Sequence, residues 1–123
     1  MKHSKVLVTF ILLFTSSLLW ASEPAATVSM SNQLAFEPAS ITIKAGETVR
    51  FVNNSALPHT VTADPAKARK MGSVSLPEGA ETFDSGNLAA GESFSHTFTK
   101  PGTYQYFCIP HEMAGMTGTI IVQ

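Results

Sequence analysis

The sequence predicts an all-β fold, a sandwich or barrel of about seven to eight short strands. Short runs in which polar and apolar residues alternate recur along the chain, and Gly, Pro and Asn separate them. No stretch of convincing length has the apolar spacing of an amphipathic helix. The 123 residues leave room for a single domain.

In the first half, turn residues bound the expected strands. A strand is expected near residues 27–31. Residues 40–44 alternate polar and apolar as far as Ala45-Gly46-Glu47, and residues 48–52 stop at Asn53-Asn54-Ser55. Another short strand is expected at residues 59–62.

The second half begins with residues 64–86, the least regular segment, in which a short helical turn is expected at 66–70. Residues 93–98 alternate again and end at the strong turn signal Lys100-Pro101-Gly102. Residues 103–108 and 117–122 complete the predicted strands.

Residues 1–21 have the pattern of a secretory signal peptide. Lys2, His3 and Lys5 give a basic start, residues 6–20 form an almost unbroken apolar run, and Ala21 offers a small residue for cleavage. The alternative is a membrane anchor, but the apolar run of about 15 residues is shorter than the roughly 20 that a spanning helix needs. We therefore expect an exported domain at residues 22–123, most simply in a bacterial periplasm because the leader is short and basic.

Cysteine use and charge narrow the function of this domain. Small exported proteins usually pair their cysteines as disulfides, whereas this chain has only Cys108. A bound metal would protect the lone thiol from oxidation. The chain has 8 basic and 9 acidic residues and no basic run, which argues against a nucleic-acid partner.

Residues 108–116 bring three metal-binding side chains into one loop. Cys108, His111 and Met116 follow Cys-x2-His-x4-Met spacing between two predicted strands, and His59, at the start of another strand, can complete the site. Two imidazoles, a thiolate and a weakly bound thioether suit both Cu(I) and Cu(II), so little has to move when the oxidation state changes. Zinc is the main competing metal, but Met is a poor zinc ligand and only one Cys is present.

Each of these side chains also has an ordinary structural interpretation. A lone Cys at a strand end is commonly a small buried hydrophobic residue. A lone His is commonly structural or exposed, and a loop Met commonly belongs to the core. The joint spacing favours a metal site over these separate roles. We therefore predict one copper ion per chain.

Several motifs resemble the plastocyanins, blue copper proteins of the cupredoxin family. They are Phe36-Glu37-Pro38, Ala45-Gly46-Glu47, Asn53-Asn54 before Pro58-His59, Pro101-Gly102-Thr103-Tyr104 and the loop from Cys108 to Met116. The resemblance implies a Greek-key cupredoxin sandwich and one type 1 copper held by His59, Cys108, His111 and Met116. It also implies that His111 is the ligand at the solvent edge, through which electrons pass to docked partners. By resemblance, a cyanobacterial thylakoid lumen is the alternative location.

Two departures from the plastocyanins lie beside the implied ligands. Thr60 follows His59, where plastocyanins have an Asn that helps to tie the ligand loops together. We expect Thr60 to donate a hydrogen bond there, and we expect Asn54 to lie with it next to the ligands. Glu112 follows His111 directly, and its carboxylate should favour Cu(II) and lower the reduction potential, modestly if solvent screens it.

The loops around His111 are expected to form a docking face for transient redox partners. Its expected residues are Leu57, Pro58, Pro110, Glu112, Met113 and Ala114. Negative charge from Glu112 would suit a basic partner such as a c-type cytochrome, and a copper or haem oxidoreductase is the other kind of partner expected. Lys67, Arg69 and Lys70 stand in place of the acidic cluster of plant plastocyanins, which weakens the case for a photosynthetic partner. We expect a monomer without stable membrane insertion after signal cleavage.

Two further residues are interpreted as lying outside the copper site. Met113 is not at the spacing that the resemblance gives to the axial ligand, so it is assigned to the docking face. His96 shares a face with Phe94 and Phe98 by period-two alternation, and it is interpreted as a core-facing His with a local hydrogen bond.

The predicted function is that of a redox shuttle that cycles between Cu(I) and Cu(II). The alternative is a copper-handling protein for delivery, sequestration or tolerance, which would favour Cu(I) alone. The mixed ligand set favours the shuttle, because a delivery site gains nothing from balancing two oxidation states. A copper enzyme is disfavoured, because the remaining histidines, His3 and His96, cannot build a second metal site.

Overall fold

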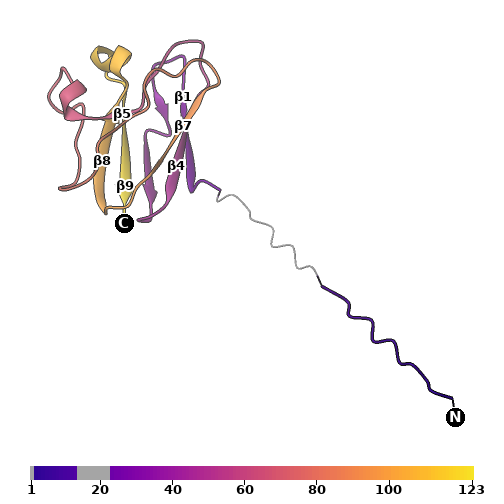
Figure 1. Cartoon of the computed structure of the whole chain (residues 1–123). Coiled ribbons are helices and arrows are strands. Elements are labelled where there is room, and N and C mark those ends of the chain that lie inside the picture. The colour runs from indigo at the N-terminus through magenta and orange to yellow at the C-terminus, as the bar shows by residue number, and fades with distance from the viewer. Residues whose placement is uncertain (1, 14–22) are drawn as a thin grey trace.

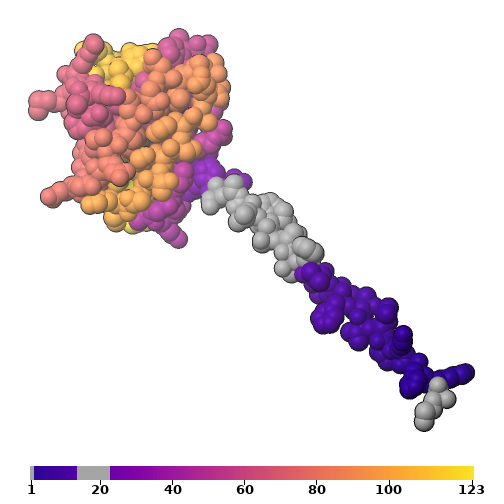
Figure 2. Space-filling view, in the orientation of Figure 1, coloured from indigo at the N-terminus to yellow at the C-terminus, as the bar shows by residue number. Residues whose placement is uncertain are grey.

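A computed structural model describes residues 2–13 and 23–123. Residues 2–13 are exposed and have no regular secondary structure, and they extend away from the folded domain (Figures 1 and 2). Ala21 lies outside the described residues, so cleavage there, and the domain boundary between residues 21 and 22, stay predictions. Within the described residues, no helix is long and apolar enough to cross a membrane.

The folded part is a sandwich of two mixed sheets (Figure 1). The first sheet has the order β2-β1-β4-β7, and the second has the order β3-β9-β8-β5-β6. The strands are β1 (Ala26–Met30), β2 (Phe36–Glu37), β3 (Ser40–Ile43), β4 (Thr48–Asn53), β5 (Thr62–Ala63), β6 (Phe83–Asp84), β7 (Ser93–Thr97), β8 (Gly102–Phe107) and β9 (Thr117–Val122). The all-β prediction is confirmed, and all but the shortest strands lie where the alternation predicted them.

The differences concern the shortest elements. Strands β2, β5 and β6 have two residues each, too few for a period-two pattern to be visible in the sequence. The strand predicted at 59–62 is reduced to β5, while His59 forms an isolated bridge with Leu88. The helical turn predicted at 66–70 is the 3-10 helix η1 (Pro65–Lys67), which begins earlier because Asp64 caps it by accepting a hydrogen bond from Ala66 N at 3.0 Å.

The core lies between the sheets, and aromatic rings cross it. Alternation along β4 turns Val49, Phe51 and Asn53 inward. The Tyr106 ring from β8 meets the Phe51 ring edge-on at 5.3 Å and the Phe36 ring at 4.6 Å. These contacts between strands far apart in the sequence fix how the two sheets face each other.

Strand directions bring the predicted site residues to one end of the sandwich. Strands β8 and β9 are antiparallel, with Phe107 opposite Thr117, so the loop from Cys108 to Met116 leaves and re-enters the sheet at one end. Thr62 pairs with Phe107, which places the segment before β5 beside that loop. The loop itself forms the 3-10 helix η2 (Ile109–Ala114), drawn in yellow in Figure 1.

Candidate metal centre

Hydrogen bonds fix both the backbone and the imidazole ring of His59. Its backbone exchanges two hydrogen bonds with Leu88, at 3.2 and 2.8 Å, and its side chain is fully buried. The ring atom Nε2 lies 3.2 Å from the carbonyl oxygen of Ser31. Because a carbonyl can only accept, Nε2 carries the hydrogen and Nδ1 keeps a free lone pair. This is the arrangement that orients a histidine for metal binding.

Cys108 directly follows β8, and its sulfur faces both histidines. Its Sγ lies 3.6 Å from Nδ1 of His59 and 3.3 Å from Nδ1 of His111. The backbone N–H of Thr60 donates to the same sulfur at 3.4 Å. Three metal-binding atoms therefore converge, all within 4.8 Å of one another.

His111 and Met116 come from the loop that follows. His111 is half-buried, in contrast to His59, and the two imidazole rings lie 4.9 Å apart. The loop is closed by hydrogen bonds from Cys108 N to Met116 O at 3.1 Å and from Met116 N to His111 O at 3.3 Å. Met116 is buried within the core, whereas Met113 is 74% exposed. The exposure of Met113 agrees with the sequence interpretation that it lies outside the copper site.

The protonation equilibria of the buried ligands favour a bound cation. Burial raises the pKa of the Cys108 thiol, although the hydrogen bond from Thr60 N opposes this. Burial and the neighbouring His111 lower the pKa of His59, so the imidazole stays neutral. A bare thiolate is thus disfavoured at this position, whereas a cation between the sulfur and the two lone pairs would stabilise it.

The donor set fits copper. Donor separations of 3.3 and 3.6 Å suit a single ion bonded at roughly 2.0–2.3 Å to each atom. Two imidazoles and one thiolate form the trigonal set of blue copper sites, to which such sites add a weakly bound axial Met. Among the described residues, no second Cys or carboxylate joins this group to make a typical zinc tetrahedron.

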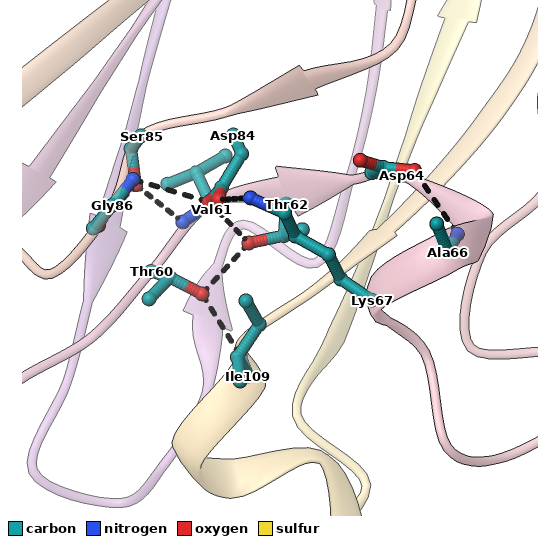
Figure 3. Close-up of polar contacts among 10 residues, drawn as sticks. All are labelled: Thr60, Val61, Thr62, Asp64, Ala66, Lys67, Asp84, Ser85, Gly86 and Ile109. Carbon is teal, nitrogen blue, oxygen red and sulfur yellow. Dashed lines mark hydrogen bonds and ion pairs between the residues drawn. The ribbon is translucent and has the colours of Figure 1, made fainter.

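Thr60 does connect the two ligand segments, as predicted, but with different hydrogen-bond roles. Its Oγ1 accepts a hydrogen bond from Ile109 N at 2.8 Å, next to Cys108 (Figure 3). Donation to the ligand region comes from its backbone N–H instead. Thr60 therefore binds two consecutive residues of the ligand loop.

The prediction for Asn54 is wrong, and Asn53 takes its place. The exposed Asn54 side chain donates to Ser29 Oγ, away from the ligands. Asn53 is fully buried, and its Nδ2 donates to Leu57 O at 2.7 Å and to Leu88 O at 2.9 Å, which fixes the turn leading to His59. The sequence did carry a signal for this, because the alternation of β4 turns residue 53 inward and residue 54 outward.

The prediction that Glu112 adds charge to the docking rim is also wrong. Its side chain is 3% exposed and points away from solvent. Its carboxylate accepts hydrogen bonds from Arg69 N at 2.9 Å, Lys70 N at 3.0 Å and Ser73 Oγ at 2.7 Å. Burial alone would raise the pKa of Glu112, but these hydrogen bonds and the Arg69 charge lower it below its ordinary value. A buried carboxylate needs such donors, and the 69–73 segment supplies them.

The other predicted docking residues are exposed at the end of the molecule that carries the ligand loop, shown in yellow in Figure 2. They are Leu57, Pro58, Pro110, Met113 and Ala114, and the structure adds Ile109 to them. Glu112 is therefore the one predicted member of this face that does not reach the surface.

His96 lies outside the metal-binding group, as interpreted from the sequence. Its half-buried ring is 4.1 Å from the Phe83 ring and 4.7 Å from the Phe98 ring. The local hydrogen bond expected for it is not found among the described residues, although the Glu81 carboxylate lies near enough to oppose the lowering of its pKa. Burial lowers its pKa, so the neutral ring is favoured in this position.

Comparison with known proteins agrees with this geometry. The family model for copper-binding proteins of the plastocyanin/azurin family matches residues 24–123. Plastocyanin from Scenedesmus fuscus is 46% identical over 97 residues, which cover 76% of this chain and 91% of that protein. Plastocyanin from Prochlorothrix hollandica is 33% identical and covers 99% of this chain, with 94% of its own length aligned.

Solved structures show the same fold. A pseudoazurin from Sinorhizobium superposes with a TM-score of 0.63 at 35% identity, over 80% of this chain and 72% of that one. An oxidized amicyanin variant superposes with a TM-score of 0.62 at 26% identity, over 84% and 86% of the two chains. These likenesses favour electron transfer over copper handling and over enzymatic catalysis. The chain belongs to the plastocyanin/azurin family of copper-binding proteins and is a blue copper electron carrier.

Proposed function

We propose that His59, Cys108, His111 and Met116 hold the copper ion of this electron carrier. The observation that carries the proposal is the convergence of two imidazole Nδ1 atoms on the Cys108 sulfur, at 3.3 and 3.6 Å. Met116 is assigned as the weak axial ligand because it is buried and its backbone is hydrogen-bonded to Cys108 and His111. The ion supplies a one-electron change between Cu(I) and Cu(II), and the chain keeps its ligands in place.

Electron exchange is proposed to occur at the half-buried His111, inside the docking face. Leu57 and Met113 are exposed apolar side chains of that face, and small apolar contacts suit brief association with a redox protein. Because Glu112 is buried, it gives no reason to expect a basic partner. A c-type cytochrome or a copper or haem oxidoreductase is proposed as the partner because each exchanges single electrons.

The location proposed for the mature domain is outside the cytoplasm, in a bacterial periplasm. The basic start and short apolar run of residues 1–21 support export. A lone buried Cys that binds metal also suits an oxidising compartment. The relatives include chloroplastic plastocyanins, for example from Physcomitrium patens, and a thylakoid lumen is the alternative compartment.

The test is a titration of the mature protein with Cu(II), followed by ascorbate and then by reoxidation. We expect an intense blue absorption that saturates at one copper per chain, bleaches with ascorbate and returns on reoxidation. The Cys108→Ser variant should stay folded and colourless, because the colour depends on the thiolate. A colourless wild-type protein that binds only Cu(I) or prefers zinc would reject the proposal.

A further inference from the structure

A continuous chain of hydrogen bonds leads from the ligand loop to the side of the sandwich (Figure 3). Ile109 N donates to Thr60 Oγ1 at 2.8 Å, and Thr60 Oγ1 lies 2.8 Å from Thr62 Oγ1. Thr62 Oγ1 donates to Asp84 Oδ1 at 2.9 Å. The other carboxylate oxygen of Asp84 forms an ion pair with Lys67.

The chemistry of its two ends fixes the direction of every hydrogen bond in this chain. A backbone N–H such as that of Ile109 can only donate, and an ionised carboxylate such as Asp84 can only accept. The single hydroxyl hydrogen of Thr62 is therefore used on Asp84. Thr60 must then donate its own hydrogen to Thr62, which leaves the Thr60 oxygen free to accept from Ile109.

Asp84 is held as a carboxylate. Burial alone would raise its pKa, but hydrogen bonds from Lys67, Gly86 and Thr62 lower the pKa below its ordinary value. Gly86 N donates to Oδ1 at 3.1 Å, the oxygen that also accepts from Thr62. Asp84 thus stays an acceptor, and the direction of the chain does not reverse at neutral pH.

The middle of the chain is closed to water. Thr60 and Thr62 are both buried, so a lost hydrogen bond between them cannot be replaced by solvent. Aligned hydrogen bonds that end on a charge also strengthen one another in a low-dielectric interior. The strength of the hydrogen bond between Thr60 and Ile109 therefore depends on Thr62 and Asp84, which form no hydrogen bond with the ligand loop themselves.

We propose that Asp84, acting through Thr62 and Thr60, is a positioning residue for the copper ligand loop. Thr60 binds the loop twice, by Oγ1 to Ile109 N and by its backbone N–H to Cys108 Sγ. Hydrogen bonding at the Cys sulfur is one of the factors that set the reduction potential of blue copper sites. The expected effect on the reduction potential of copper rests on the proposed function. The expected effect on hydrogen exchange at the Ile109 amide depends only on the chain of hydrogen bonds.

The first readout is amide hydrogen exchange in the copper-free protein, measured residue by residue by NMR. Thr62→Val keeps the shape and removes the hydroxyl, and Asp84→Ala removes the terminal acceptor. We expect each variant to speed exchange at Ile109 about three- to tenfold, the equivalent of one hydrogen bond. The Gln105 amide, which donates to Ser75 O at 2.8 Å, serves as the reference for general destabilisation.

Three comparisons distinguish an effect carried by the hydrogen bonds from a direct effect of the Asp84 charge. Asp84→Ala should add little in the Thr62→Val background, because the chain is already interrupted there. Asp84→Asn should partly restore protection, since its amide oxygen can still accept from Thr62. Asp64→Asn is the matched control, because Asp64 caps η1 beside Lys67 but stands outside the chain, and it should leave Ile109 exchange unchanged.

The second readout is the reduction potential of the copper protein. A weaker hydrogen bond to the sulfur favours Cu(II), so Thr62→Val, which changes no charge, should lower the potential. Unchanged Ile109 exchange in Asp84→Ala, or equal effects of Asp84→Ala in both backgrounds, would overturn the proposal. If the wild-type protein bound no copper, the proposed function would fail while the exchange result would still decide whether the chain positions the loop.

Discussion

The two ends of η2 are attached to the rest of the molecule in different ways. At the Cys108 end, Thr60 holds Ile109 through neutral hydroxyls, and the charge lies at the far end of the chain, on Asp84. Towards the other end, Glu112, the residue after His111, buries its carboxylate and accepts hydrogen bonds from residues 69–73. The Thr60 attachment contacts the ligand sulfur, whereas the Glu112 attachment fixes where the loop lies on the sandwich.

This difference separates two tasks that a redox site imposes on one loop. The electronic environment of the sulfur is best set by weak, adjustable dipoles, because a full charge nearby would shift the potential strongly. Anchoring the loop demands a strong interaction, which a carboxylate with several donors provides. The hydrogen bonds to Glu112 also disperse the negative charge of its carboxylate.

The largest effect should come from removing the Glu112 anchor. Glu112→Ala leaves two backbone N–H groups and the Ser73 hydroxyl without their acceptor, so we expect the free energy of unfolding to fall by about 2–4 kcal/mol. Glu112→Gln should lose less, because one acceptor oxygen remains. Urea unfolding of the copper-free protein measures both, and Glu78→Ala, at an exposed carboxylate, is the control. A loss as small as that of the control would mean that Glu112 is no anchor.

The Thr60 attachment should cost less stability but change the site more. Thr60→Ala removes the acceptor of Ile109 N, and we expect a loss of about 1–2 kcal/mol. Thr60→Ser keeps the hydroxyl and should retain most of the stability and of the blue absorption band. The reduction potential should also distinguish the two attachments. For each kcal/mol of unfolding free energy lost, it should shift more in Thr60→Ala than in Glu112→Ala. Equal shifts at equal loss would remove the distinction between the two attachments.

Tyr106 tests how much a buried polar group without a hydrogen-bond partner lowers the free energy of unfolding in this core. Its hydroxyl is buried and has no hydrogen-bond partner within the described residues, and burial raises its pKa. Tyr106→Phe removes this group and keeps the ring contacts with Phe36 and Phe51, so we expect a gain of about 1 kcal/mol. Thermal unfolding measures the change. A clear loss of stability instead would indicate that the hydroxyl has a bound partner such as water.

The smallest effect concerns pH and Asp84. Its pKa in the folded protein lies below the ordinary value of 3.8, so its stabilising contribution is complete above that pH and disappears as the pH falls through the folded-state pKa. Lys67 is the charged partner of Asp84, and because this ion pair is partly exposed, its contribution is small. Unfolding at pH 6 and pH 3 should show wild type and Asp84→Asn converging at the lower pH. A constant difference would contradict the assignment.

The sequence predicted the sandwich and the candidate ligands because both leave local patterns. Alternation marks strands of four or more residues, and Cys-x2-His-x4-Met is a contiguous motif. The same alternation, continued by one residue, would have distinguished Asn53 from Asn54. Thr60 could be singled out because it adjoins His59, but the direction of its hydrogen bonds depends on Asp84, more than twenty positions away.

Glu112 was misplaced for a physical reason. Its donors are mostly backbone N–H groups of residues 69–73, and any residue type except Pro offers such a group. No side-chain pattern in that segment marks it as the binding site for a carboxylate. The two-residue strands β2 and β6 were not predicted for a similar reason, because they form by pairing with other strands and not from a local sequence pattern.

The most direct test of the central claim is X-ray absorption at the copper edge of the loaded mature protein. The claim is that one ion sits between the Cys108 sulfur and the Nδ1 atoms of His59 and His111. It predicts one short copper–sulfur shell and two copper–nitrogen bonds, at about 2.0–2.3 Å, with the sulfur shell missing in Cys108→Ser. A first shell of nitrogen and oxygen alone in the wild-type protein would contradict it.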